Sequence, residues 1–195
     1  MTYVAFLRGI NVGGNAIVAM AAIKGALVAA GMTDVRTYIN SGNVIFSSTA
    51  SDARKLAINI ESALELHTGM AIKVLVIDHQ ALAKIVAAIP ADWVDDRTMR
   101  TYVLLLWNEI DDSAILERLP ARVGIDEVRY TPGAVIWRVD GTDVTRSGRS
   151  RIVGTPLYKQ ITIRSANTMR KLDVLTATSG SQAGAARRAA RNRGS

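Results

Sequence analysis

A glycine-rich loop that begins with an arginine is the part of this sequence that most directly suggests chemistry. Residues 8–15 read Arg-Gly-Ile-Asn-Val-Gly-Gly-Asn and lie between an apolar run, residues 3–7, and a helix-like pattern. Glycine permits backbone conformations that direct several N–H groups at one point, the start of a helix adds its dipole, and Arg8 brings a fixed positive charge. The loop therefore predicts a site for a small anion, while a polar turn that only reverses the chain fits the same residues.

A second turn is expected beside this loop. Residues 40–43, Asn-Ser-Gly-Asn, join two β-branched or aromatic runs and are typical of a hairpin. In a ferredoxin-like βαββαβ unit the first strand is parallel to the second, so the loop after the first strand and the hairpin after the second lie at the same end of the sheet. A pocket rich in hydrogen-bond donors would suit phosphate or carboxylate. The candidate ligand-binding residues of the two segments are Arg8, Gly9, Asn11, Gly13, Gly14, Asn40, Ser41, Gly42 and Asn43.

The apolar pattern divides the chain into four parts. Residues 1–78 are predicted to form a first α+β subdomain, residues 79–100 a bridging helix and linker, residues 101–178 a second α+β subdomain, and residues 179–195 a disordered basic tail. The predicted fold class is α+β, with two related ferredoxin-like subdomains of the βαββ type and mainly antiparallel sheets.

The second subdomain is interpreted as a degenerate copy of the first. The run at residues 102–107 resembles residues 3–8, and residues 127–137 resemble residues 34–46. Asn108-Glu109-Ile110 stands where the glycine-rich loop is in the first copy. Function, if it depends on that loop, is therefore expected in the first copy.

Composition indicates a folded, soluble chain. It is 49% hydrophobic and 21% charged, which is enough to bury a core, and it has no cysteine, so disulfides and thiolate metal sites are excluded. The sequence has neither a basic leader nor an apolar run of the roughly 20 residues that a membrane span needs. We therefore expect a cytoplasmic protein that makes no use of a membrane.

No cofactor or metal is expected. The two histidines, His67 and His79, are not at ligand spacing from each other or from a pair of acids. The sequence also lacks a phosphate-binding Gly-Lys-Ser/Thr loop, a dinucleotide fingerprint and a nucleophile elbow. The loop at residues 8–15 lacks the lysine of a phosphate-binding loop, which excludes a nucleoside triphosphatase.

Three functions remain open at this point. The first is binding of a small phosphate- or carboxylate-bearing ligand, with phosphoryl or acyl transfer as the reaction that such a site could support. The second is nucleic-acid binding by the basic segment 146–159 and the tail, which contributes +4 to the formal net charge of +7. The strands, however, lack the paired aromatic residues of an RNA-binding sheet. The third is a structural or regulatory domain that binds another protein.

Three segments also match the pattern of a known family. They are residues 3–14, residues 37–44 with Phe46, and Thr162, Arg164, Asn167 and Thr168 before Lys171-Leu172. On these residues the chain resembles the bacterial family described as domain of unknown function 1697. The resemblance implies an α+β fold related to the ferredoxin-like arrangement and adds Arg164 and Asn167 to the candidate ligand-binding residues, but it brings no reaction. The chain departs from the family at Ser165 and Ala166, where asparagine and an aromatic residue are usual.

Overall fold

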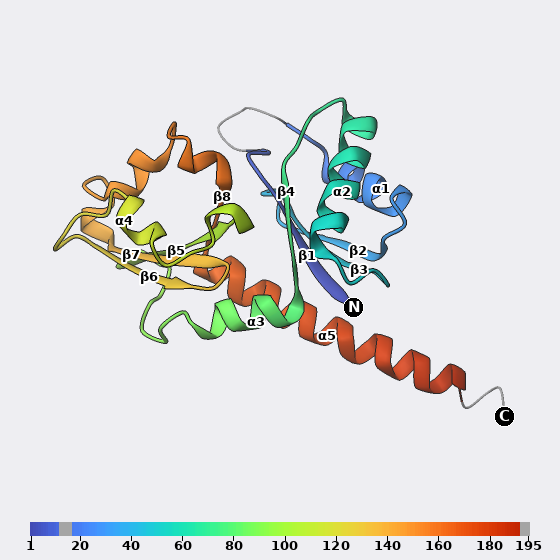
Figure 1. The fold of residues 1–195 in the computed structure, drawn as a ribbon. Coiled ribbons are helices and arrows are strands. Elements are labelled where there is room, and N and C mark those ends of the chain that lie inside the picture. The colour runs from blue at the N-terminus through green and yellow to red at the C-terminus, as the bar shows by residue number, and fades with distance from the viewer. Residues whose placement is uncertain (12–16, 192–195) are drawn as a thin grey trace. The chain divides into compact units, whose positions relative to one another are not determined.

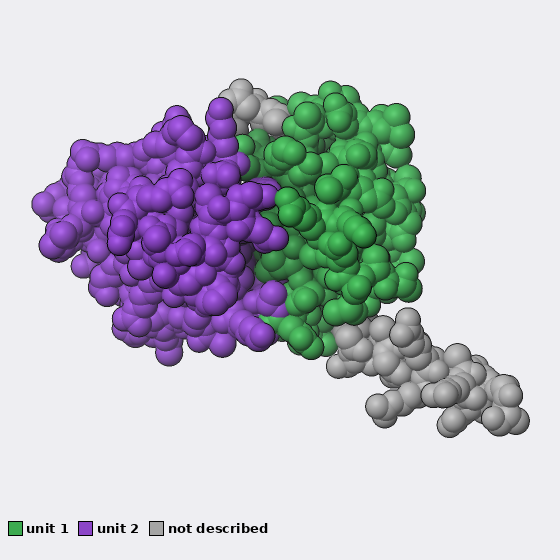
Figure 2. All heavy atoms as spheres, in the orientation of Figure 1, with its two compact units in different colours: residues 1–80, 172–195 green, residues 81–171 purple. Residues whose placement is uncertain are grey.

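The chain forms two compact units in the computed structural model. The first unit consists of residues 1–80 and 172–195, and the second of residues 81–171 (Figure 2). The structure describes the backbone of residues 1–11 and 17–191 and the side chains of residues 1–11 and 17–178. None of the described helices is both long and apolar enough to cross a membrane.

The first unit has the element order βαββαβ (Figure 1). Its elements are β1 (Thr2–Leu7), α1 (Met20–Ala29), β2 (Thr33–Tyr38), β3 (Asn43–Ser47), α2 (Ala53–Thr68) and β4 (Val74–Asp78). The sheet order is β2-β3-β1-β4, and every neighbouring pair is antiparallel. This is the ferredoxin-like arrangement that the sequence predicts, so β1 runs parallel to β2.

The core of the first unit lies between the sheet and helices α1 and α2. Side chains alternate along a strand, so Tyr3, Ala5 and Leu7 of β1 point to the same face and belong to this core. Helix α2 begins after Asp52, whose carboxylate accepts hydrogen bonds from the backbone N–H groups of the first turn. It ends at Gly69, which has a positive φ of 69°.

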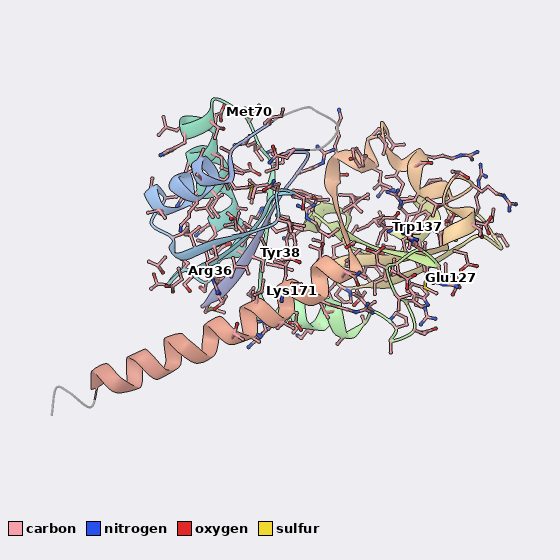
Figure 3. The ribbon with its side chains drawn as sticks, turned by 180° about the vertical axis from the view of Figure 1, so that it is seen from behind. Arg36, Tyr38, Met70, Glu127, Trp137 and Lys171 are labelled. Atoms are coloured by element: carbon pink, nitrogen blue, oxygen red, sulfur yellow. The ribbon has the colours of Figure 1, made fainter. Side chains whose placement is uncertain are left out.

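The second unit repeats the strand order with much shorter helices. Its strands are β5 (Met99–Leu106), β6 (Asp126–Thr131), β7 (Ala134–Asp140) and β8 (Ile161–Ser165). Between them lie the α-helix α4 (Ile115–Arg118) and four 3₁₀ helices, η1 (Asn108–Ile110), η2 (Gly141–Asp143), η3 (Gly148–Ile152) and η4 (Leu157–Gln160). The sheet order β6-β7-β5-β8 matches that of the first unit, position for position. Trp137 of β7 is completely buried, and Figure 3 shows it among the side chains of this unit. The two related units that the sequence predicts are therefore present.

Two helices contribute residues to both units. The division falls after Gln80 in α3 (His79–Ala87) and after Lys171 in α5 (Ala166–Arg191), whereas the sequence analysis placed residues 101–178 together. The reason is a set of contacts made by α5 within the first unit. Arg36 on β2, labelled in Figure 3, donates a hydrogen bond to the Leu175 carbonyl at 3.4 Å.

The basic C-terminal segment continues helix α5. The sequence analysis expected disorder from residue 179, but α5 continues to Arg191. Residues 183–190 contain five alanines, and alanine has the highest intrinsic helix propensity. The composition of this segment is therefore compatible with a helix as well as with a polar tail. The disorder of the tail stays a prediction.

Candidate functional site

The loop after β1 starts with a tight change of direction. Gly9 has a φ of 70° and Asn11 a φ of 53°, both in the left-handed region that glycine and asparagine tolerate best. Between them Ile10 is buried and belongs to the core of the first unit. The N–H of Arg8 donates to the Lys73 carbonyl at 2.9 Å, which fixes the start of the loop to the residue before β4.

Asn11 joins the loop to the hairpin between β2 and β3. Its Nδ2 donates to the carbonyl oxygens of Asn40 at 2.9 Å and Val18 at 3.1 Å, and its Oδ1 accepts from the Val18 N–H at 2.9 Å. The Asn11 side chain therefore links the start of the loop to Val18 and to the hairpin between β2 and β3. The structure thus brings together the two segments that the topology predicts to be neighbours, and Asn11 has a positioning role.

The hairpin is shaped by Gly42 and Asn43. Gly42 has a φ of 77°, its carbonyl accepts from the Leu7 N–H at 2.8 Å, and a Cβ built on it would lie 2.9 Å from the Leu7 Cβ. Asn43 is completely buried, and its Nδ2 donates to the Tyr38 carbonyl at 3.2 Å and to the Ser41 Oγ at 3.1 Å. Both residues therefore build the turn rather than present a side chain outward. Asn40 is exposed and Ser41 is half-buried, so the tip of the hairpin faces solvent.

The first 33 residues of the first unit carry basic but no acidic side chains. Residues 1–33 include Arg8 and Lys24 but no aspartate or glutamate. The carboxylate of Glu61 on α2 accepts from the Lys73 ammonium at 3.0 Å and from the Val74 N–H at 2.9 Å. The Glu61 carboxylate is therefore bound by Lys73 and by the first residue of β4.

The predicted site residues fall into three groups. Arg8, Gly9 and Asn11 lie with the hairpin residues 40–43 at one end of the first sheet. Gly13 and Gly14 lie outside the described residues. Arg164 and Asn167 belong to the second unit.

Arg164 is a buried arginine on β8. Its side chain donates to the Thr162 Oγ1 at 2.9 Å and to the Ile163 carbonyl at 2.8 Å, and the residue is 8% exposed. Burial lowers the pKa of Arg164 to about 10, so the guanidinium stays protonated at neutral pH. Asn167, in the first turn of α5, donates its Nδ2 to the Asp95 carbonyl at 2.8 Å and so holds the segment before β5.

The basic segment 146–159 contains the 3₁₀ helix η3 and most of η4, joined by turns. Arg146 forms an ion pair with Asp143 at 2.8 Å, and the Arg149 guanidinium lies over the Tyr102 ring, 4.0 Å from its centroid. Both arginines therefore have partners within the second unit. Asp126 anchors the segment, because its carboxylate accepts from the Ser147 Oγ at 2.5 Å and the Gly148 N–H at 2.8 Å.

Sequence reasoning missed two residues at the first loop. Lys73 was not placed beside Arg8, because only the pairing of β1 with β4 makes them neighbours. Ile39, the first residue of the turn, has a φ of 49° and is 50% exposed. A β-branched residue rarely adopts this conformation, so no preference of its own could have indicated it.

Comparison with known proteins agrees with this architecture. The solved structure of conserved bacterial protein SP0830 from Streptococcus pneumoniae is similar, with a TM-score of 0.76 and 25% sequence identity, over 90% of this chain and 98% of that one. No curated protein matches the sequence. The profile of the family described as protein of unknown function DUF1697 matches residues 1–137, which include the loop, the hairpin and the first strands of the second unit. The chain belongs to this DUF1697 family.

Proposed function

We propose that the first unit binds a small anion, bearing phosphate or carboxylate, at the loop that follows β1. The observation that carries the proposal is the Asn11 amide, which bonds to both Val18 and Asn40 and so holds the loop and the hairpin together beside Arg8. The Asn11 side chain, through these bonds, holds the backbone around it in place. Backbone N–H groups in a fixed arrangement next to an arginine favour the binding of an anion.

The comparison between the two units supports placing the site in the first one. The hairpin has four residues between the ladder partners Tyr38 and Asn43, but only two between Thr131 and Ala134 in the second unit. The glycine-rich loop is likewise specific to the first copy. The two additions meet at the Asn11–Asn40 hydrogen bond. Two extensions that are found in one copy and contact each other support a role beyond the shared fold.

The side chains of the loop and the hairpin favour binding over group transfer. In the described residues 8–11 and 39–43, Ser41 carries the one hydroxyl group, and its Oγ accepts from the Asn43 amide at 3.1 Å. A nucleophilic hydroxyl needs a base that takes its proton, and an amide donor does not serve as one. Arg8 and the backbone N–H groups suit recognition of a charge that the ligand already carries.

A ligand screen by thermal shift tests this proposal. Phosphate, sulfate, nucleotides and carboxylates are added at constant ionic strength, and a ligand at one hundred times its dissociation constant adds about 2.7 kcal/mol to the free energy of unfolding. For a chain of this size the melting temperature should rise by about 5 to 11 °C. Arg8→Ala should abolish the rise, and Arg54→Ala, which changes an exposed arginine on α2, should leave it intact. The proposal fails if no anion at millimolar concentration changes the melting temperature.

A further inference from the structure

Strand β6 forms one edge of the sheet in the second unit, at the end of the order β6-β7-β5-β8 (Figure 1). Its ladder with β7 runs from Asp126 to Thr131 without a shift of register, and the strand contains no proline. The edge strand β2 of the first unit differs, because its register with β3 shifts between Thr33 and Arg36. Such an irregularity protects an edge from pairing with a further strand, and β6 lacks it.

The pairing of β7 with β5 determines which backbone groups of β6 face outward. The Leu106 N–H donates to the Gly133 carbonyl at 3.0 Å, as the Leu7 N–H does to the Gly42 carbonyl in the first unit. The odd-numbered residues of β7 therefore direct their backbone groups at β5, and the even-numbered residues direct theirs at β6. The ladder pairs these even-numbered residues with residues 127, 129 and 131 of β6. Residues 126, 128 and 130 consequently direct their N–H and C=O groups away from the sheet.

Two N–H groups on this outer side of β6 have no partner in the described part of the chain. The Asp126 N–H donates to the Arg122 carbonyl at 2.9 Å. The N–H groups of Val128 and Tyr130 make no such bond to any described residue. Their side chains pack against the core of the second unit, so the two residues are fixed in place while their N–H groups stay open.

The charged side chains beside these N–H groups are arranged in a self-complementary order. Glu127 and Arg129 flank Val128, lie on the face opposite to it, and are exposed; Glu127 is labelled in Figure 3. Two copies of β6 that pair antiparallel about Val128 place each Glu127 opposite Arg129 of the second copy. A centre one residue earlier or later would instead place two glutamates or two arginines opposite each other. Opposite charges across a ladder stabilise it and like charges destabilise it, so charge favours one register.

Both charged side chains also have contacts within the second unit. Glu127 forms an ion pair with Arg138 of β7, and the Arg129 guanidinium lies over the Trp93 ring, 4.8 Å from its centroid. A carboxylate has two acceptor oxygens and a guanidinium has five N–H donors, so each side chain keeps the capacity for a further partner.

We propose that the second unit is a dimerisation module, in which β6 pairs with β6 of a second copy of this chain, antiparallel and centred on Val128. The Val128 N–H donates to the Val128 carbonyl of the second copy, and the Tyr130 N–H donates to its Asp126 carbonyl. Both open N–H groups thereby gain an acceptor, while the Asp126 N–H keeps its bond to Arg122. The four-stranded sheet then continues across two copies related by a two-fold axis, and a contact of this symmetry closes at the dimer.

Sedimentation equilibrium of the full chain over a range of concentrations tests this proposal. We expect the average mass to rise with concentration toward that of a dimer. Glu127→Arg and Arg129→Glu each place like charges opposite one another, so each variant alone should dimerise at least about tenfold more weakly. An equal mixture of the two variants should recover the dimer, because the positively charged edge of one then faces the negatively charged edge of the other.

Two matched variants control for the change in net charge. Glu117→Arg on α4 and Arg151→Glu on η3 alter exposed side chains outside β6 and should leave the association unchanged. Association that these variants weaken equally, or that the mixture does not recover, would overturn the proposal. A chain that stays monomeric at millimolar concentration would overturn it as well.

Hydrogen exchange of the unchanged chain gives a second measurement that does not depend on the folding of any variant. The amides of Val128 and Tyr130 should exchange at least about tenfold more slowly at a concentration that favours the dimer than in the monomer. Association without this protection would show that the copies, or a strand from another protein, bind elsewhere, and the proposed pairing of β6 would be wrong.

Discussion

The Nδ1 atom of His79 lies 2.9 Å from the Oγ1 atom of Thr176, 97 residues later in the chain. His79 is the first residue of α3, and Thr176 lies on α5 and is completely buried. The Thr176 hydroxyl also lies 2.9 Å from the Asp173 carbonyl of its own helix. This contact lies next to the two places where the chain leaves and re-enters the first unit, after Gln80 and before Leu172.

Thr176→Val tests how much this contact stabilises the first unit. Valine keeps the shape of threonine but removes the hydroxyl, so the free energy of unfolding should fall by about 1 kcal/mol. Thr178→Val is the matched control: its hydroxyl bonds only to carbonyls of the same helix turn and its side chain is exposed, so its effect should stay within about 0.5 kcal/mol. Urea denaturation measures both. Equal effects of the two variants would show that the His79 contact contributes nothing measurable.

The equivalent glycines of the two hairpins should respond differently to alanine. At Gly42 a Cβ would lie 2.9 Å from the Leu7 Cβ, within a rigid strand, whereas at Gly133 it would meet the Ile85 Cδ1 at 3.3 Å, the end of a flexible side chain. Both variants carry the strain of a positive φ, roughly 1–2 kcal/mol. Gly42→Ala adds overpacking of about 1–3 kcal/mol.

We therefore expect Gly42→Ala to be the more destabilising of the two by at least about 1 kcal/mol. Denaturant melts of both variants measure the difference. A larger effect at Gly133 would contradict the packing described around Leu7.

The carboxylate of Asp126 makes the second unit sensitive to acid. Burial on its own would raise the pKa of Asp126, but hydrogen bonds from Ser147, Gly148, Arg122 and Trp137 outweigh burial and hold the pKa below its ordinary value. A carboxyl group whose pKa is lower in the folded state stabilises the fold above the pKa of the unfolded chain, about 3.9, and this stabilisation is lost as the pH falls through the folded pKa.

Asp126→Asn should therefore destabilise the protein at pH 7 and lose its effect in acid. One amide group replaces an oxygen that accepts from N–H and O–H donors, so the free energy of unfolding should fall by about 1–3 kcal/mol at neutral pH. The gap to the unchanged protein should narrow below about pH 4. Asp34→Asn, at an exposed position, is the control and should have little effect at either pH. A gap that stays constant from pH 7 to pH 3 would refute the assigned role of the Asp126 charge.

The α+β fold class of both units could be predicted because strands and hairpins follow from local patterns. The apolar run at residues 3–7, the hairpin at residues 40–43 and the echo of both in the second half specify two ββ hairpins and their partner strands. The unit boundary could not be predicted, because it depends on contacts such as Arg36 with Leu175, which join residues far apart in the chain.

The position of the candidate site could be predicted from the sequence, but the role of each of its residues could not. Topology alone brings the loop to the hairpin, and the structure agrees through the Asn11–Asn40 bond. Sequence could not distinguish asparagines that satisfy backbone groups from those that face a ligand, since the residue type suits both. The structure shows the Asn11 and Asn43 side chains bonded to backbone groups, so the proposal assigns the ligand contacts to Arg8 and to main-chain N–H groups.

The last prediction concerns Ile39, the first residue of the hairpin turn. At a φ of 49° any L-residue is strained, and glycine is not, so Ile39→Gly should be more stable than Ile39→Ala by about 1 kcal/mol. This order is the reverse of that in a helix, where glycine is about 1 kcal/mol less favourable than alanine. Ile58, 59% exposed in the middle of α2, provides the matched pair: Ile58→Gly should be less stable than Ile58→Ala. Urea melts of the four variants give both differences. The same sign at the two positions would rule out the left-handed conformation of Ile39. Opposite signs would locate backbone strain directly beside Asn40, the residue through which the Asn11 amide holds the proposed anion site together.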